Sequence, residues 1–293
     1  MTYQEQYANY LAQLEDTLKA VCDEQLPVDS KVGQAARYSL LAGGKRIRAI
    51  LTMACCELLQ GDLQAATRFA CAVEMVHCFS LIHDDLPCMD DDDYRRGKPS
   101  CHKAYDEATA LLAGDALLNA AFEVIATTST SDTAKLGAIR ALSQGTGLQG
   151  MIYGQELDMA FEHGLPTEED LRKIHRNKTG ALINASVQMG LCAGNASEQD
   201  KRILQEFAYG IGLVFQIVDD VLDVTSTSEE LGKPVGSDAE NGKVTFATLY
   251  QPEQAMEMAR QLNNQICTVL HQAYGQRADF LIQLAELLLS RKH

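Results

Sequence analysis

Hydrophobic residues recur at helical spacing along almost the whole chain. Clear examples are QAARYSLLAGGKRIRAILTMACCELL, ATRFACAVEMVHCFSLIHDD and KRILQEFAYGIGLVFQIVDDVLDV, in which apolar positions return every three or four residues. Alternating runs typical of β-strands are hard to find. The pattern predicts an all-α fold, a helical bundle of roughly ten or more helices joined by short loops. Since no composition shift suggests a boundary, we expect a single domain over residues 1–293.

Capping residues and prolines mark where the predicted helices begin and end. Thr167 precedes three acidic residues, and Ser197 precedes Glu198 and Asp200, as an N-cap with acids in the first turn does. Breaks are expected at Pro27, Pro87, Pro99, Pro166, Pro234 and Pro252. One polar connection, residues 225–243, is unusually long, and loops beyond about 12 to 15 residues are often functional lids.

The composition limits the kinds of partner. With 46% hydrophobic residues among 293, the chain can form a large core. No run reaches the roughly 18 uninterrupted apolar residues of a membrane span, and the N-terminus resembles no signal segment. Nine cysteines without a CxxC motif favour reduced thiols and a cytoplasmic location. A net charge of -15 argues against nucleic acid, whereas a phosphorylated small molecule can bind through metal ions.

Two segments concentrate aspartate beside apolar helical sequence. In FQIVDDVLD, Asp219 and Asp223 stand four residues apart and share a helix face, so a positive group should lie between them. In SLIHDDLPCMDDDDYRR, Asp84 and Asp85 end a helix, where the helix dipole is already negative. Carboxylates without zinc-spaced histidine or cysteine suit hard ions such as Mg²⁺. Either cluster alone could be a solvated or ion-paired surface, but two together favour a metal site.

Basic residues accompany the aspartates. A compact GGKRIR occupies residues 43–48, Arg95 and Arg96 directly follow the first cluster, and Lys178, Lys233 and Lys243 lie further along the chain. In so acidic a chain, this grouping indicates a polyanion held partly by guanidinium groups and partly by metal. GGKRIR lacks the GxxxxGK[ST] pattern of a P-loop and follows a helical pattern.

These motifs together resemble a known family. GGKRIR, DDLPCMDDDDYRRGKP, KTG, FQIVDDVLD and LGKPVGSD, in that order, are similar to the motifs of the trans-isoprenyl diphosphate synthases, and most similar to those of bacterial farnesyl diphosphate synthases. The resemblance implies an all-α bundle around a central active-site cavity, a homodimer, and a Mg²⁺-dependent prenyltransferase. Such an enzyme condenses isopentenyl diphosphate with dimethylallyl and geranyl diphosphate, using three Mg²⁺ ions, for which Mn²⁺ could substitute.

The resemblance also assigns roles residue by residue. It implies metal ligands at Asp84, Asp85, Asp90, Asp91, Asp219, Asp220 and Asp223; isopentenyl diphosphate contacts from Gly44, Lys45, Arg48, His77 and Arg96; allylic diphosphate contacts from Arg95, Lys178, Lys233 and Lys243; and stabilisation of the reacting allylic cation by Lys178, Thr179 and Gln216. Asp92 and Asp93 are expected to be a solvated acidic run. Arg291 and Lys292 are similar to tails that cover the second diphosphate, or else form a frayed end.

Product length rests on two residues before the first aspartate motif. Phe79 lies five positions before Asp84, roughly 7.5 Å along a helix, where the family places a bulky residue as the tunnel floor. Ser80 beside it is small. We expect the C15 product farnesyl diphosphate, with the C20 product geranylgeranyl diphosphate as the alternative and Phe79 as plain core filler still open. A terpene cyclase or a noncatalytic subunit of a heteromeric synthase fits less well, because DDVLD and the other aspartates are intact.

Overall fold

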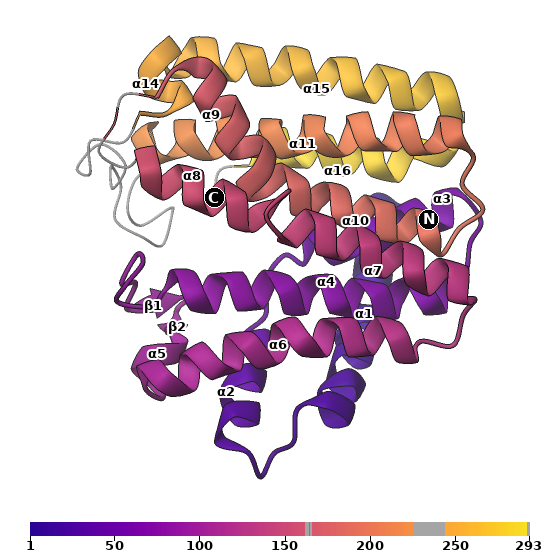
Figure 1. The fold of residues 1–293 in the computed structure, drawn as a ribbon. Coiled ribbons are helices and arrows are strands. Elements are labelled where there is room, and N and C mark those ends of the chain that lie inside the picture. Colours follow the sequence, from indigo (N-terminus) through magenta and orange to yellow (C-terminus); the bar gives the residue numbers. More distant parts are fainter. Residues whose placement is uncertain (162–163, 165, 226–243, 292–293) are drawn as a thin grey trace. The chain divides into compact units, whose positions relative to one another are not determined.

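Helices account for nearly all regular structure in the described part of the chain, so the predicted all-α fold is confirmed (Figure 1). The structure is a computed structural model and describes residues 1–161, 164, 166–225 and 244–291. These residues form two compact units. The first comprises Met1–Leu142 and Gln188–Asn195, and the second comprises Ser143–Val187 and Ala196–His293. The single domain expected for residues 1–293 stays a prediction.

The first unit is built from the N-terminal helices and one small hairpin. Its elements are α1 (Tyr3–Gln25), α2 (Lys31–Leu40), α3 (Ile47–Leu58), α4 (Leu63–Asp84), β1 (Tyr94–Arg95), β2 (Lys98–Pro99), α5 (Cys101–Ala104) and α6 (Glu107–Thr127). Helices α7 (Asp132–Thr146) and α10 (Ala181–Cys192) belong partly to each unit.

Helix α4 is the core helix of the first unit. It packs against α1, α3 and α6, and most of its residues, including Phe69, Met75 and Val76, are fully buried. Helix α6 runs alongside it (Figure 1). The two helices approach closely because Gly114 has no side chain: a Cβ there would lie 2.2 Å from Nε2 of His83.

Helices α4 and α6 are also long and apolar enough to cross a membrane by length and composition. The apolar window of α4 is 78% buried, and that of α6 is 50% buried. A core helix of a globular protein gives the same result as α4, so this is weak evidence for a span. The expectation that the chain does not cross a membrane stays a prediction.

One segment that was expected to be helical throughout is interrupted. QAARYSLLAGGKRIRAILTMACCELL forms α2 and α3 with a loop between them, because Gly43 and Gly44 have φ of 85° and 126° and Arg46 has φ of 52°. Residues in the left-handed region end a right-handed helix. GGKRIR follows a helix, α2, as expected, but the break inside the longer apolar segment was not predicted.

The second unit contains α8 (Met151–Phe161), α9 (Glu168–His175), the π-helix η1 (Arg176–Gly180), α11 (Glu198–Thr225), α14 (Phe246–Tyr250), α15 (Pro252–Tyr274), the 3₁₀-helix η2 (Gly275–Ala278) and α16 (Asp279–Ser290). Its core includes Val214, Ile217 and Val218 of α11 packed with Phe246 and Ala255. Helix α11 contacts both α15 and α16 (Figure 1).

The predicted helix starts in this unit are confirmed. Thr167 and Asp170 form a capping box at the start of α9, and Ser197 exchanges hydrogen bonds with Asp200 at the start of α11. The break predicted at Pro252 is also confirmed: α14 ends at Tyr250 and Pro252 is the first residue of α15, a position where its missing N–H has no intrahelical partner to lose.

Candidate active site

The first aspartate motif is closed into a tight turn at the end of α4. The amide of Asp90 donates to the carbonyl of Asp84 at 2.9 Å, and the amide of Asp91 donates to the carbonyl of Leu86 at 3.2 Å. Asp91 has a φ of 51°, a conformation that aspartate tolerates better than most residues. The turn therefore brings the backbones of Asp84 and Asp90, predicted as metal ligands, beside each other.

Protein cations already pair with several carboxylates of this motif. Arg95 Nε donates to Asp85 Oδ1 at 2.9 Å, and Arg95 Nη2 donates to both Asp85 and Asp92. Lys103 Nζ lies 2.8 Å from Asp93. Burial raises the pKa of Asp85, an effect that Arg95 opposes. Asp92 and Asp93 are exposed, as expected, but they are ion-paired rather than merely solvated.

The short β-hairpin that follows positions the two arginines. Tyr94 pairs with Pro99 and Arg95 with Lys98, and the two turn residues, Arg96 and Gly97, both have positive φ. Two consecutive positive φ values define the type I′ turn, whose twist matches a tight hairpin. No alternating pattern in the sequence predicts this hairpin, because each strand has only two residues.

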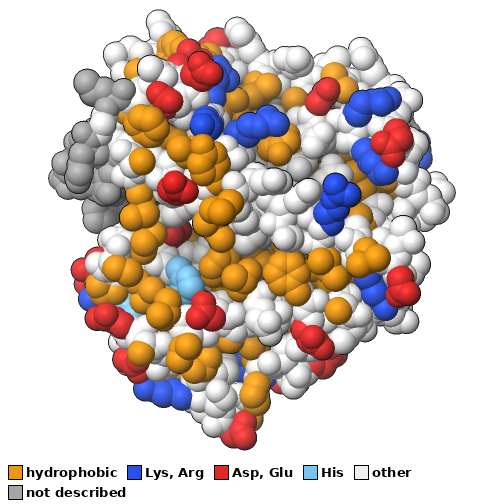
Figure 2. Space-filling model, in the orientation of Figure 1, with side chains coloured by type: hydrophobic (Ala, Val, Ile, Leu, Met, Phe, Trp, Pro, Cys, Tyr) orange, Lys and Arg blue, Asp and Glu red, His pale blue; other side chains and the backbone are white. Residues whose placement is uncertain are grey.

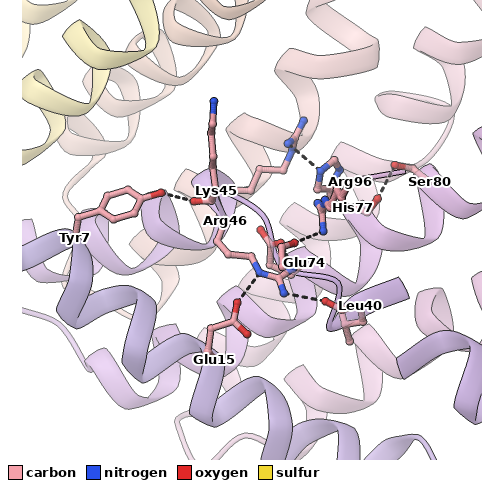
Figure 3. A network of polar contacts seen from close by, with 11 residues as sticks. Tyr7, Glu15, Leu40, Lys45, Arg46, Glu74, His77, Ser80 and Arg96 are labelled. Carbon is pink, nitrogen blue, oxygen red and sulfur yellow. Dashed lines mark hydrogen bonds and ion pairs between the residues drawn. The ribbon is translucent and has the colours of Figure 1, made fainter. Parts of the chain in front are cut away.

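The hairpin brings Arg96 against the GGKRIR loop. Arg96 Nη1 donates to the carbonyl of Gly43, as Figure 3 shows. A Cβ on Gly44 would lie 3.0 Å from Cζ of Arg96, and Gly44 also has positive φ. Glycine is therefore required at this position on two counts, and the hairpin contacts the loop through Arg96.

His77 of α4 contacts the GGKRIR segment through Arg48. Its Nε2 is 3.4 Å from Nη1 of Arg48, and its backbone carbonyl accepts from the hydroxyl of Ser80 at 2.9 Å. Burial, reinforced by Arg48 and Arg96, lowers the pKa of His77 well below its usual range. His77 is therefore neutral at pH 7 and can take part in hydrogen bonding without adding charge. The first unit thus gathers Gly44, Arg48, His77 and Arg96, with Lys45 in the same loop.

The two predicted chain-length residues lie on α4 between His77 and Asp84. Phe79 is buried at 6% exposure, and its ring meets that of His83 edge to face with centroids 5.3 Å apart. Ser80 is partly exposed. The burial of Phe79 fits both a tunnel floor and a core residue, so its role stays a prediction.

The KTG motif lies in a π-helix. Residues Arg176–Gly180 form η1, and single π-turns inserted between α-helices occur frequently at functional sites. A Cβ on Gly154 of α8 would lie 2.0 Å from the backbone nitrogen of Lys178, so the α8 backbone runs directly against this turn. Thr179 is buried. Neither the π-turn nor its contact with α8 was predicted.

Lys178 has a partner that sequence reasoning missed. Its Nζ lies 2.6 Å from Oδ2 of Asp158 on α8, with the two side chains 28% and 14% exposed. The pair fixes the lysine side chain that the resemblance places on the allylic diphosphate. Asp158 stands in the segment GQELD, and nothing in the sequence shows which cation it meets.

The second aspartate motif lies near the C-terminal end of α11. Asp219 Oδ1 is 2.7 Å from Nη2 of Arg291, and the same arginine donates to the carbonyl of Phe215 at 2.7 Å and lies over its ring at 3.8 Å. A positive group was predicted at this motif, and Arg291 provides one for Asp219. The expectation of a frayed end is wrong for Arg291, whose side chain is only 12% exposed.

Asp220 points to a different neighbour. Its Oδ2 accepts from the backbone amide of Phe246 at 2.9 Å and lies 3.8 Å from Nε2 of His175. Phe246 is fully buried and stacked on His175, so Asp220 holds the start of α14 against α9 and α11. The assignment of Asp220 as a metal ligand stays a prediction, as do those of Asp223, which is buried, and Gln216, which is partly exposed.

Two predicted contacts cannot be located. Lys233 and Lys243 lie outside the described residues, as do residues 226–243 of the predicted lid at 225–243. Within the described ranges, no three His, Cys, Asp or Glu side chains already converge as a metal site. A groove of about 630 Å³ on the second unit, lined by residues such as Arg176, Leu213 and Ile266, includes none of the predicted site residues.

These features define a class of protein. An all-α fold that presents clustered carboxylates beside clustered guanidinium and ammonium groups is suited to handling phosphorylated small molecules. Comparison with known proteins identifies the family: residues 29–279 match the polyprenyl synthetase family. The chain belongs to that family and is a prenyltransferase.

Individual relatives agree over nearly the full length. The chain is 43% identical to geranylgeranyl pyrophosphate synthase 3 of Arabidopsis thaliana, covering 96% of this chain and 81% of that protein. It is similar to the crystal structure of a geranyltransferase from Legionella pneumophila, with a TM-score of 0.89, 37% identity, and coverage of 99% and 97%. A geranyltransferase from Helicobacter pylori, complexed with magnesium and isoprenyl diphosphate, gives a TM-score of 0.88, 34% identity and 99% coverage of each chain.

Proposed function

We propose that this prenyltransferase condenses isopentenyl diphosphate with dimethylallyl and then geranyl diphosphate to form farnesyl diphosphate. The observation that carries the proposal is the cluster on the first unit, where the Asp84–Asp90 turn leads through the hairpin to Arg96 at the GGKRIR loop. The cluster contains groups of both signs: its carboxylates can bind metal ions, and its guanidinium groups can bind diphosphate oxygens.

Mg²⁺ fits the donors that are present. The carboxylates of Asp85 and Asp219 already attract cationic side chains, Arg95 and Arg291, and hard oxygen donors are the ligands that Mg²⁺ prefers. We infer that Asp84, Asp85, Asp90 and Asp91 would hold ions on the first unit and that Asp219, Asp220 and Asp223 would hold one on the second. The bound ions would supply charge neutralisation of the departing diphosphate. A complement of three ions and Mn²⁺ as a substitute belong to the same proposal.

Cations on both units would bind the diphosphates of the substrates. Lys45, Arg48 and Arg96, with neutral His77 as a hydrogen-bonding group, would hold isopentenyl diphosphate. Arg95 would contact the allylic diphosphate from the first unit. On the second unit Lys178 would do so, oriented by Asp158 at 2.6 Å, and Lys233 and Lys243 remain proposals that fall outside the described residues.

The reaction needs no side-chain nucleophile. The C1–O bond of the allylic substrate breaks and releases diphosphate. The double bond of isopentenyl diphosphate then attacks C1 of the allylic cation. Finally, C2 of the isopentenyl unit loses a proton to the released diphosphate. Thr179, held buried in the π-turn, Lys178 and Gln216 would stabilise the allylic cation through oriented dipoles. Excluding water from the cation is the role expected for a lid.

Farnesyl diphosphate is proposed over geranylgeranyl diphosphate on the basis of Phe79. Its burial on α4 before the aspartate turn supports a floor that stops elongation at C15, and two similar solved structures are named geranyltransferases, enzymes that extend a C10 substrate. A similar curated protein is named a geranylgeranyl pyrophosphate synthase, which favours the C20 product as the second candidate.

A second copy of the chain is the proposed protein partner, in a homodimer. On α6 Leu111 and Leu112 are 46% and 51% exposed, and Leu136 on α7 is 67% exposed. Exposed hydrophobic side chains gather in the lower-left part of Figure 2, where α6 lies. Light scattering should give twice the chain mass, and L111E/L112E should give the monomer mass. We also infer a cytoplasmic location, supported by nine free cysteines, mostly buried.

Incubation with labelled isopentenyl diphosphate and Mg²⁺ tests the function directly. Dimethylallyl or geranyl diphosphate should each give a C15 product on chromatography, and D84N and D219N should abolish it while the proteins remain folded by circular dichroism. A C20 product would replace the farnesyl assignment with the second candidate. No condensation product from folded protein would refute the synthase proposal.

A further inference from the structure

Arg46, inside the GGKRIR loop, is a buried charge with no assigned role. It is 3% exposed, although Lys45 before it is exposed and Arg48 is partly so. In Figure 3 the Lys45 side chain points away from Arg46, and the Arg46 side chain extends toward Glu15 and Glu74. Because it is buried among protein groups, Arg46 is not suited to bind a diphosphate itself.

Each nitrogen of the Arg46 guanidinium meets a protein acceptor. Nε donates to Glu15 at 2.9 Å, Nη1 to Glu74 at 3.1 Å, and Nη2 to the carbonyl of Leu40 at 2.8 Å. These acceptors lie on α1, on α4 and at the end of α2. The planar, rigid guanidinium group of arginine can donate to three acceptors in different directions at once. A lysine ammonium group cannot reproduce that geometry.

Stability alone does not account for this arrangement. The Glu74 side chain is 2% exposed, and burying such an ion pair costs desolvation that its attraction often only balances. Apolar residues of similar volume frequently give equal or greater stability at such positions. The ion pair also fixes the position of the loop backbone at Arg46 relative to α4, which carries Glu74.

That backbone has an unusual conformation. Gly43 and Gly44 have positive φ, and so does Arg46, for which a φ of 52° is unfavourable. The carbonyl of Lys45 accepts a hydrogen bond from the hydroxyl of Tyr7. A loop with three left-handed residues in four has many alternatives of similar energy unless tertiary contacts select one. The three hydrogen bonds of the Arg46 guanidinium group are tertiary contacts that can select one loop conformation.

The same network reaches the other predicted contacts of isopentenyl diphosphate. Glu74 lies one turn before His77 on α4, and His77 contacts Arg48 at 3.4 Å. Arg96 donates to the carbonyl of Gly43 at the start of the loop (Figure 3). The ion pair between Arg46 and Glu74 therefore fixes the loop to the helix that carries His77.

We propose that Arg46, through Glu74 and Glu15, is a positioning residue that holds the GGKRIR loop in the geometry for binding the second diphosphate. The inference rests on the proposed function for the identity of that ligand, isopentenyl diphosphate. We expect its effect on the binding of that substrate, because Arg46 is itself part of the loop and its side chain contacts α1, α4 and the end of α2 rather than Arg95 or Lys178.

Two variants separate positioning from stability. R46M/E74M removes both charges of the buried pair together, a change that is often neutral for stability, and leaves only the partly exposed Glu15 without its arginine. R46K keeps the positive charge but lacks the planar guanidinium group. R37M is the matched control, because Arg37 also bonds a carboxylate, that of Asp23 at 2.6 Å, and a helix-end carbonyl, that of Leu26 at 3.2 Å, away from the loop.

The expected result is a selective loss. R46M/E74M and R46K should raise the KM for isopentenyl diphosphate and its calorimetric Kd by about tenfold or more, since small displacements of binding groups are costly. The KM for the allylic substrate should change by less than about threefold. Hydrogen exchange of the amides at 42–48 should accelerate in both variants. R37M should lower the melting temperature without changing either KM.

Other results would overturn the proposal. If R46M/E74M melts near the wild-type temperature and keeps the wild-type Kd and loop exchange, Arg46 does not position the loop. If both variants lose affinity for both substrates in proportion to their loss of stability, Arg46 is only a structural residue. If the wild-type protein binds isopentenyl diphosphate but forms no product, the proposed function fails while calorimetry and exchange still decide this inference.

Discussion

Replacing Arg291 with glutamine is expected to strengthen Mg²⁺ binding at the second aspartate motif. Arg291 now contributes a positive charge 2.7 Å from Asp219, the residue proposed to hold a metal ion. A metal ion that binds that carboxylate must do so beside the positive charge of the guanidinium, which repels it and competes for the carboxylate oxygens. Glutamine removes the competing charge but can still donate to the carbonyl of Phe215, which accepts from Arg291 at 2.7 Å.

The size of the effect follows from the exposure of the pair. The Arg291 and Asp219 side chains are 12% and 44% exposed. Two unit charges whose centres lie about 4 Å apart attract by roughly 1 to 4 kcal/mol as the effective dielectric constant falls from water-like to surface values. Solvent screening and the ordering of two side chains leave at most about 1 kcal/mol for a pair so accessible. Removing the competitor should therefore tighten Mg²⁺ binding by about fivefold.

Isothermal titration of the substrate-free protein with Mg²⁺ measures this change directly. R277Q is the matched control, because Arg277 is also near the C-terminal end of the chain but lies over the ring of Tyr274 at 6.0 Å. Its Mg²⁺ affinity should equal that of the wild type. Unchanged or weaker Mg²⁺ binding by R291Q would refute the idea that Arg291 and the metal ion compete for Asp219.

Three further predictions concern the remaining site residues. F79A should shift the product from C15 toward C20 or longer on chromatography; an unchanged product profile would remove Phe79 from the tunnel floor. D158N should raise the KM of the allylic substrate by about three- to tenfold, since Lys178 loses the carboxylate 2.6 Å away; an equal rise for isopentenyl diphosphate would argue against a local role. His77 has a lowered pKa, so unfolding takes up a proton below about pH 6.5 and stability falls as the pH drops through that region. H77Q should show a shallower fall in melting temperature between pH 7 and 5, and an identical slope would contradict the buried neutral imidazole.

The parts of the fold that sequence predicted well depend on local patterns. Apolar spacing identified the helices, and Thr167 and Ser197 marked helix starts, because an N-cap and the amide it accepts from are three residues apart. The hairpin at Arg95–Arg96 and the break at Gly43–Gly44 were missed as structure. Both depend on positive φ values, and helical apolar spacing on either side gives no sign of them.

The parts of the site that sequence missed depend on distant partners. Lys178, Asp219 and Arg46 are recognisable as charged residues, but Asp158, Arg291 and Glu74 become their partners only after folding. The sequence indicates that a buried or clustered charge needs compensation, since an unpaired one is costly. It does not indicate which of 65 charged residues, 25 basic and 40 acidic, supplies the compensation.

The pairing of carboxylates with arginines has a consequence for substrate binding. Arg95 contacts Asp85, and we propose that Asp85 supports a metal ion while Arg95 contacts the allylic diphosphate. A metal ion that engages Asp85 weakens the hold of that carboxylate on Arg95 and so releases the guanidinium for the diphosphate. Binding linkage is reciprocal, so a diphosphate that engages Arg95 must favour metal binding at Asp85 by the same factor. Metal and diphosphate should therefore bind the first unit cooperatively, because each removes the protein partner that competes with the other.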